Sequence, residues 1–203
     1  MRYAAYRLGD KAMKILEERI LRDGVVKPGG ILKVDSFLNH QIDPQLCYEM
    51  AQEIHRLFEG ERITKILTIE ASGISVAVMT GLVFGVPAVF AKKAAGRNTS
   101  SEVYSSPVYS YTKQVTKDVI VAKEYLSAGD RVLIVDDFLA MGSALEGLCD
   151  IVAQAGAEAV GAAVVIEKAF QPGGDRLRAG GLRVEALARV RSMSDESLEF
   201  VKE

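Results

Sequence analysis

The chain has 203 residues, of which 49% are hydrophobic and 26% charged, and its formal net charge is −2 at pH 7. The length predicts a single domain with a well-formed core. The slightly negative charge argues against a nucleic-acid partner, and no apolar run approaches the ~18 residues that a membrane-spanning helix needs. Cys47 and Cys149 are too few and too far apart for a disulfide scaffold. We therefore expect reduced thiols and a cytoplasmic location.

The first predicted elements are two helices separated by a short strand. Apolar residues at helical spacing predict a helix over residues 13–21, and residues 31–34 have the pattern of a short strand. Asp43 followed by Pro44 is a typical helix start, because the carboxylate can cap the first turn and proline suits the first helical position. The apolar side chains of residues 47–58 then form one face of an amphipathic helix.

Further along the chain, strand-like and helical segments alternate. Gly85 and Gly156 directly follow two helical patterns, at the position where a left-handed residue often ends a helix. Residues 103–111 and 119–122 can pair as a hairpin. The order predicts an α/β fold with a mainly parallel sheet covered by helices on both faces. The predicted strands are residues 65–69, 87–91, 131–135 and 160–166, and the predicted helices are residues 74–84 and 145–155.

Residues 132–144 (VLIVDDFLAMGSA) are the most informative segment. A buried parallel strand runs into the paired carboxylates Asp136 and Asp137, and a loop with Gly142 leads to the next helix. Ligands of open α/β sheets bind at this end of the strands, where helix N–H groups can hold a phosphate. The carboxylates can hold sugar hydroxyls or, through water, a metal ion. The pattern indicates a ribose 5-phosphate site; an acidic helix cap, a phosphorylated receiver and a metal hydrolase are the alternatives.

At these residues the chain resembles the phosphoribosyltransferases of purine salvage. Three other segments narrow the resemblance to the bacterial xanthine-specific branch, namely residues 33–44 (KVDSFLNHQIDP), 70–73 (EASG) and 166–172 (IEKAFQP). The resemblance implies the type I phosphoribosyltransferase fold, a mainly parallel sheet flanked by helices. It also implies a small hood subdomain, formed by about residues 24–44 and 167–190, which covers the base.

The resemblance begins near residue 13. We therefore expect residues 13–203 to form the phosphoribosyltransferase domain and treat residues 1–12 as an N-terminal extension without an assigned function. The implied reaction joins xanthine to phosphoribosyl pyrophosphate and gives xanthosine 5′-phosphate and pyrophosphate. Mg²⁺ is expected to be bound mainly through phosphoribosyl pyrophosphate and water, without a metal site of the protein's own. Members of the family usually form two-fold dimers, so a homodimer is expected.

Two other functions stay open at this point. A hypoxanthine–guanine acceptor range differs from a xanthine preference only at position 2 of the purine. A regulator that senses phosphoribosyl pyrophosphate and binds DNA would need an added DNA-binding module. No basic helix stands out in this sequence, and its charge is slightly negative, so we prefer the enzyme.

The resemblance assigns roles to the acidic pair and to the loop after it. Asp136 and Asp137 are the catalytic pair, which would bind the 2- and 3-hydroxyls of the ribose. Only one residue of the loop retains a hydroxyl, so backbone N–H groups must make most of the phosphate contacts. An ordinary turn between strand and helix is the alternative. The loop consists of Ala140, Met141, Gly142, Ser143 and Ala144.

A second loop is implied to bind pyrophosphate. Lys92, which directly follows a strand, is expected to bring positive charge to it. In the family this loop often contains a strained peptide, and we expect a cis bond between Ala71 and Ser72. A simple turn and a solvated lysine are the alternatives. The loop residues are Glu70, Ala71, Ser72 and Gly73.

Three residues bear on the choice of purine. The Lys168 ammonium can only donate hydrogen bonds, so it suits a 6-oxo purine and opposes the amino group of adenine. Asn39 has donors and an acceptor for a 2-oxo group, and Leu32 is expected to offer backbone groups to xanthine. Apart from the resemblance, Asn39 reads as a turn residue and Lys168 as a surface lysine.

Overall fold

The computed structural model describes residues 13–93, 102–110, 114–195 and 197–202. The expected extension at residues 1–12 lies outside these ranges. In chain order the elements are α1 (Lys14–Asp23), β1 (Val25–Lys27), β2 (Ile31–Lys33), the π-helical turn η1 (Asp35–Asn39), α2 (Pro44–Leu57), β3 (Lys65–Ile69), α3 (Ile74–Phe84), β4 (Ala88–Lys93), β5 (Val103–Ser110), β6 (Val115–Ala122), the 3-10 turn η2 (Lys123–Tyr125), β7 (Arg131–Leu139), α4 (Ser143–Gln154), β8 (Glu158–Lys168), α5 (Gly173–Ala179), β9 (Val184–Met193) and β10 (Leu198–Phe200).

The main sheet has the strand order β10-β9-β8-β7-β3-β4-β6-β5. Its centre is parallel, since β4, β3, β7, β8 and β9 pair parallel to one another, while the outer pairs are antiparallel. The predicted mainly parallel α/β sheet is therefore confirmed. The predicted hairpin is also present as β5 and β6, and a second small sheet pairs β1 with β2.

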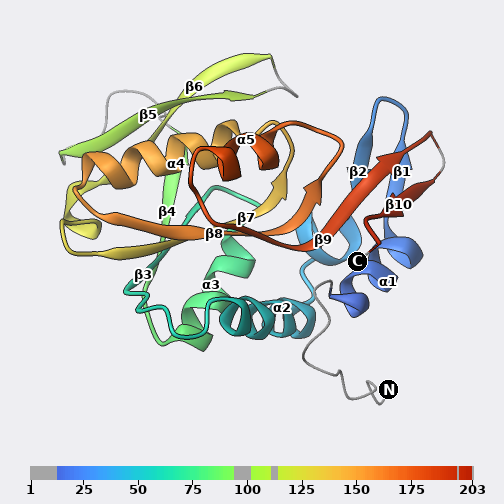
Figure 1. Cartoon of the computed structure of the whole chain (residues 1–203), viewed down its shortest axis with the longest axis horizontal. Coiled ribbons are helices and arrows are strands. Elements are labelled where there is room, and N and C mark those ends of the chain that lie inside the picture. Colours follow the sequence, from blue (N-terminus) through green and yellow to red (C-terminus); the bar gives the residue numbers. More distant parts are fainter. Residues whose placement is uncertain (1–12, 94–101, 111–113, 196, 203) are drawn as a thin grey trace.

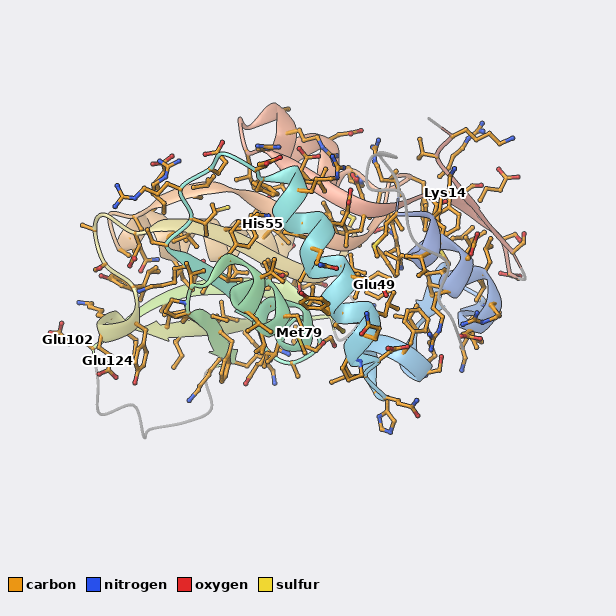
Figure 2. The ribbon with its side chains drawn as sticks, turned by 90° about the horizontal axis from the view of Figure 1, so that it is seen from below. Lys14, Glu49, His55, Met79, Glu102 and Glu124 are labelled. Carbon is orange, nitrogen blue, oxygen red and sulfur yellow. The ribbon has the colours of Figure 1, made fainter. Side chains whose placement is uncertain are left out.

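Helices cover both faces of the parallel strands (Figure 1). α2 and α3 lie side by side beneath the sheet, where Figure 2 shows Glu49 and His55 along α2 and Met79 on α3. α4 lies on the other face, between the sheet and the β5–β6 hairpin. The alternating side chains of β7 explain this arrangement. Leu133 and Val135 pack into the cluster that contains α2 and α3 residues, and Val132 and Ile134 pack into the cluster around α4.

Local signals begin or end several helices where they were predicted. The Asp43 carboxylate accepts the Leu46 N–H at 3.1 Å and caps α2. Gly85 and Gly156 have φ angles of 67° and 68° after α3 and α4, as the sequence predicts. Gly24 follows α1 in an extended conformation, with a φ of −76°.

Three strands were absent from the prediction. β1, β9 and β10 have mixed polar and apolar sequences. β1 is stabilised by pairing with β2, β9 by pairing with β8, and β10 by pairing with β9. β9 extends the main sheet beside β8, within the segment expected to belong to the hood. A hydrophobic cluster beneath this end of the sheet joins α1, η1 and β9 to α2.

Candidate active site

A pocket of about 380 Å³ opens at the carboxyl ends of β3 and β7. These strands are neighbours, but the chain continues from β3 to β4 on one side and reaches β7 on the other. Such a reversal leaves a crevice at the strand ends, where α/β sheets bind their ligands. The pocket is lined by residues from the β3–α3 loop, β4, β5, the end of β7 and the start of α4.

Asp136 and Asp137 both line this pocket, but they lie within β7 rather than in the loop after it. The predicted strand was too short, because β8 supplies backbone partners as far as Leu139. Successive side chains of a strand face opposite sides, so the two carboxylates differ in environment. Asp136 is 4% exposed and Asp137 is half-buried. One Asp136 oxygen accepts the Asp137 N–H at 3.0 Å.

Burial dominates the electrostatics of Asp136. Removal from water raises the pKa of Asp136 well above its ordinary range, and the neighbouring charge of Asp137 raises it further. The positive charge of Lys93 acts in the opposite direction but is a weaker influence. A ligand that brings hydroxyl donors or a cation to such a carboxylate stabilises its charged form.

The loop after β7 has the geometry expected of a phosphate-binding loop. All five residues from 140 to 144 line the pocket, and Gly142 has a φ of 85°, which favours glycine. Ser143 and Ala144 are the first residues of α4, so this helix begins two residues earlier than predicted. The N-terminal end of α4 therefore faces the pocket with backbone N–H groups that have no partner within the helix.

The loop between β3 and α3 forms the opposite wall. Glu70, Ala71 and Ser72 line the pocket. Gly73 lies behind them, because a β-carbon at Gly73 would come within 2.3 Å of the Thr68 hydroxyl and 3.0 Å of an Asp136 oxygen. The cis peptide is present one residue before the expected position, between Glu70 and Ala71.

The lysine at this wall is Lys93, which corrects the prediction of Lys92. β4 continues to Lys93, and side chains alternate along it. The side chains of Phe90 and Lys92 both line a separate groove on the other side of the strand. The Lys93 N–H donates to the Glu70 carboxylate at 2.7 Å, and its ammonium donates to the Glu70 carbonyl at 2.8 Å. Strand alternation would have found Lys93 if the strand end had been known.

Leu32, Asn39 and Lys168, the residues assigned to the purine, do not line this pocket themselves. The Lys168 ammonium donates to the Gly30 carbonyl at 2.8 Å and lies 5.9 Å from the centre of the Phe138 ring, which lines the pocket. Burial lowers the pKa of Lys168. Leu32 is buried in the hydrophobic cluster against which Phe138 packs. The Asn39 side-chain oxygen is buried and has no hydrogen-bond partner among the described residues.

Several further pocket residues were not predicted as site residues, among them Phe138 and Tyr109. Phe138 lies in the extension of β7 beyond the expected strand end, and the Lys168 ammonium lies near its ring. Tyr109 reaches the pocket from β5, because that hairpin folds back over α4. Alternation along β7 would have indicated Phe138, whereas no local signal places β5 above the loop.

Comparisons with known proteins agree with this geometry. Residues 33–176 match the family model of the phosphoribosyl transferase domain. The chain therefore belongs to the phosphoribosyltransferase family, with the type I fold. A crystal structure of an adenine phosphoribosyltransferase from Trypanosoma brucei has the same fold, with a TM-score of 0.73 at 17% identity over 86% of this chain and 79% of that one.

The most similar curated sequences include two named xanthine phosphoribosyltransferases. The protein of Limosilactobacillus reuteri is 51% identical over 191 residues, which cover 94% of this chain and 100% of the relative. The protein of Brevibacillus brevis is 53% identical over 191 residues, which cover 94% of this chain and 97% of the relative.

Proposed function

We propose that this chain is a xanthine phosphoribosyltransferase of purine salvage. The observation that carries the proposal is the pocket at the ends of β3 and β7, where an acidic pair, a phosphate-type loop and a lysine-bearing loop meet beside Lys168. The full-length relatives named above, at 51% and 53% identity, support xanthine as the acceptor.

In the proposed reaction, N9 of xanthine forms a bond to the anomeric carbon of phosphoribosyl pyrophosphate. The bond from that carbon to the pyrophosphate oxygen breaks, its electron pair leaves with pyrophosphate, and the N9 proton passes to solvent. Asp136 and Asp137 would bind the ribose hydroxyls and stabilise the positive charge that develops on the ring. The residue 140–144 loop would hold the 5-phosphate, and the Glu70 loop with Lys93 would hold the leaving pyrophosphate.

Mg²⁺ belongs to the proposal as a cofactor. Among the described residues, no group of three or more histidine, cysteine or acidic side chains could enclose a metal ion. The half-buried carboxylate of Asp137 at the pocket is nevertheless a hard oxygen ligand of the kind that Mg²⁺ prefers. Asp136 and Asp137 would hold the ion through its water, with substrate oxygens as the other ligands. When bound, the ion would neutralise charge on the pyrophosphate.

The purine would be selected by Lys168 and Asn39. Lys168 already points one donor at the Gly30 carbonyl, and an ammonium has two more for a 6-oxo group. The Asn39 amide would donate to the 2-oxo group of xanthine, while its buried oxygen could accept a ring N–H. Leu32 lies two residues after Gly30, whose carbonyl accepts the Lys168 hydrogen bond. This closeness in the chain supports the Leu32 backbone as a further contact to the purine.

Turnover of the individual purines tests this function. With phosphoribosyl pyrophosphate and Mg²⁺, we expect kcat/KM for xanthine to exceed the values for guanine, hypoxanthine and adenine. Asn39→Asp removes the amide donor but keeps its size and an acceptor. It should lower kcat/KM for xanthine by about 10- to 100-fold, the scale of a lost hydrogen bond in a buried site, and should affect guanine less. Equal use of all 6-oxo purines by the wild type would favour the hypoxanthine–guanine function instead.

A homodimer is also part of the proposal. α3 is apolar on all sides, yet Val78 and Leu82 are 52% and 68% exposed. Its neighbour Ala88 borders the groove that contains Lys92, an apolar groove of about 370 Å³. Exposed apolar side chains on α3 and an apolar groove at β4 are features typical of an interface between proteins.

The proposed location is the cytoplasm. Both cysteines are free thiols, and burial raises the pKa of Cys149 to about 11, which makes its thiol unreactive. Within the described residues, no helix is long and apolar enough to span a bilayer.

A further inference from the structure

The short helix α5 packs against the outer side of the residue 140–144 loop. The Gly173 N–H donates to the Ala140 carbonyl at 3.1 Å. A β-carbon at Gly173 would lie 2.3 Å from that carbonyl oxygen and 2.6 Å from the Met141 carbonyl carbon, so glycine is required for this approach. Neither Gly173 nor the rest of α5 lines the pocket, and α5 therefore contacts the loop from behind.

Arg176 makes the second contact between α5 and the loop. Its Nη2 donates to the Met141 carbonyl at 2.7 Å, and its Nε donates to the Glu146 carboxylate at 2.8 Å. Glu146 belongs to the first turn of α4. One planar guanidinium thus joins the middle of the loop to the start of the helix that follows it, in a geometry that a lysine cannot reproduce with both bonds at once.

These contacts fix the direction of two peptide groups. In a trans peptide the C=O and the next N–H point in opposite directions. Because α5 holds the Ala140 and Met141 carbonyls on its own side, the N–H groups of Met141 and Gly142 are directed away from α5. The pocket lies on that side of the loop. Backbone N–H groups aimed together at one point form an anion-binding nest.

We propose that Arg176 is a positioning residue for the 5-phosphate of the substrate. It acts through the Met141 peptide and does not touch the ligand itself. The inference rests on the proposed function in one respect, that the ligand of this loop is the phosphate of a ribose 5-phosphate group. Loss of the guanidinium is expected to free the peptide to rotate and so to weaken phosphate binding without affecting the purine contacts.

The test compares Arg176→Met with a matched control, Arg183→Met. Arg183 makes the same type of link, to the Leu57 carbonyl at 2.6 Å and to the Glu185 carboxylate at 3.0 Å, and its side chain is 40% exposed against 48% for Arg176. Leu57 ends α2, and neither control contact involves the pocket. Both variants lose one bridging arginine, so a general effect on folding should be shared.

Calorimetric titration with xanthosine 5′-phosphate, xanthosine and ribose 5-phosphate is the direct measurement. For Arg176→Met we expect Kd to rise about 10-fold for both phosphates, the scale of a lost charge-assisted hydrogen bond, and to stay within about 2-fold for xanthosine. Arg176→Lys should recover part of the loss. In turnover assays, KM for phosphoribosyl pyrophosphate should rise while KM for xanthine stays unchanged.

Several results would overturn the inference. One is equal weakening of xanthosine and its 5′-phosphate, and another is a change no larger than that in Arg183→Met. Ribose 5-phosphate binding needs no turnover, so the two proposals fail separately. If the wild type binds ribose 5-phosphate and Arg176→Met weakens it, the inference stands even when no purine is converted. If the wild type does not bind ribose 5-phosphate, the role of Arg176 is refuted.

Discussion

At the scale of single residues, burial of the Asp136 carboxylate opposes folding. Its carboxyl is almost fully buried next to a second carboxyl, and burial followed by the Asp137 charge raises its pKa. The folded protein therefore binds a proton at Asp136 more tightly than the unfolded chain does. By linkage, this residue contributes stability that is complete below the unfolded pKa of about 4 and is lost as the pH rises through the folded value.

Asp136→Asn should therefore stabilise the unliganded protein while it impairs catalysis. The amide keeps an oxygen that can accept the Asp137 N–H and carries no charge to bury. We expect the free energy of unfolding at pH 8 to rise by about 1–3 kcal/mol, a gain that shrinks toward zero near pH 4. Together with Asp137→Asn it should lower turnover by at least ~100-fold. Denaturant unfolding across pH and steady-state rates check both parts; lower stability at pH 8, or near wild-type turnover, would contradict this account.

At the scale of secondary-structure elements, β8 shows how one strand supports the site at its carboxyl end. Glu167 is buried and accepts hydrogen bonds from Arg178 at 2.6 and 2.9 Å and from Arg189 at 2.8 Å. These arginines lie in α5 and β9, so one carboxylate joins three elements next to Lys168. Although burial alone opposes ionisation, the hydrogen bonds and charge of Arg178, with the charge of Arg189, lower the pKa of Glu167.

Glu167→Gln is predicted to destabilise the protein by about 3 kcal/mol at pH 7, because two arginines lose their buried counter-charge. Glu158→Gln at the other end of β8 is the matched control. The Glu158 side chain is 57% exposed against 2% for Glu167, so its pairing with Arg131 should contribute at most about 1 kcal/mol. Chemical denaturation measures both.

The Glu167 contribution has a defined pH dependence. Its folded pKa is lowered, so the stability it adds is present above the unfolded pKa and is lost as the pH falls through the folded value. The difference between wild type and Glu167→Gln should therefore narrow in acid. A constant difference across this range, or equal effects of the two glutamine variants, would show that charge is not the cause.

At the scale of the whole molecule, the two faces of the sheet are unequally covered. α4 and the β5–β6 hairpin cover one face (Figure 1). In contrast, Val78 and Leu82 on α3 are exposed, and Phe90 borders an open groove between β4 and β6. Burial of such a surface against a second copy would remove apolar area from water, which is the main favourable contribution to association.

The proposed dimer predicts a particle of twice the 22.0 kDa chain mass in light scattering. Leu82→Glu, at a site 68% exposed on α3, should shift the population toward monomer because a charge would be buried in the interface. Leu21→Glu on α1, at a site 61% exposed, is the control and should leave the mass unchanged. A monomeric wild type, or equal behaviour of the two variants, would contradict this interface.

Most of the central fold could be predicted because its signals are local. Strand β3 and helix α3 have the predicted bounds, and the cap at Asp43 and the left-handed glycines at Gly85 and Gly156 lie where the sequence indicates. The cap and the glycine turns depend on contacts within about four residues of the chain, whereas β3 also needs its pairing with β4 and β7. The strand ends were less certain, since β7 extends past Val135 only through its pairing with β8.

The sequence by itself determined the acidic pair, the glycine loop after it and the mainly parallel sheet, because residue type and periodicity specify each of them locally. Only the tertiary structure decided that Lys93 rather than Lys92 faces the pocket, that Gly30 receives Lys168, and that Arg176 holds the loop from behind. These contacts join residues 23, 138 and 35 positions apart. Their geometry follows from how the strands pair and the helices pack, which no short stretch of sequence encodes.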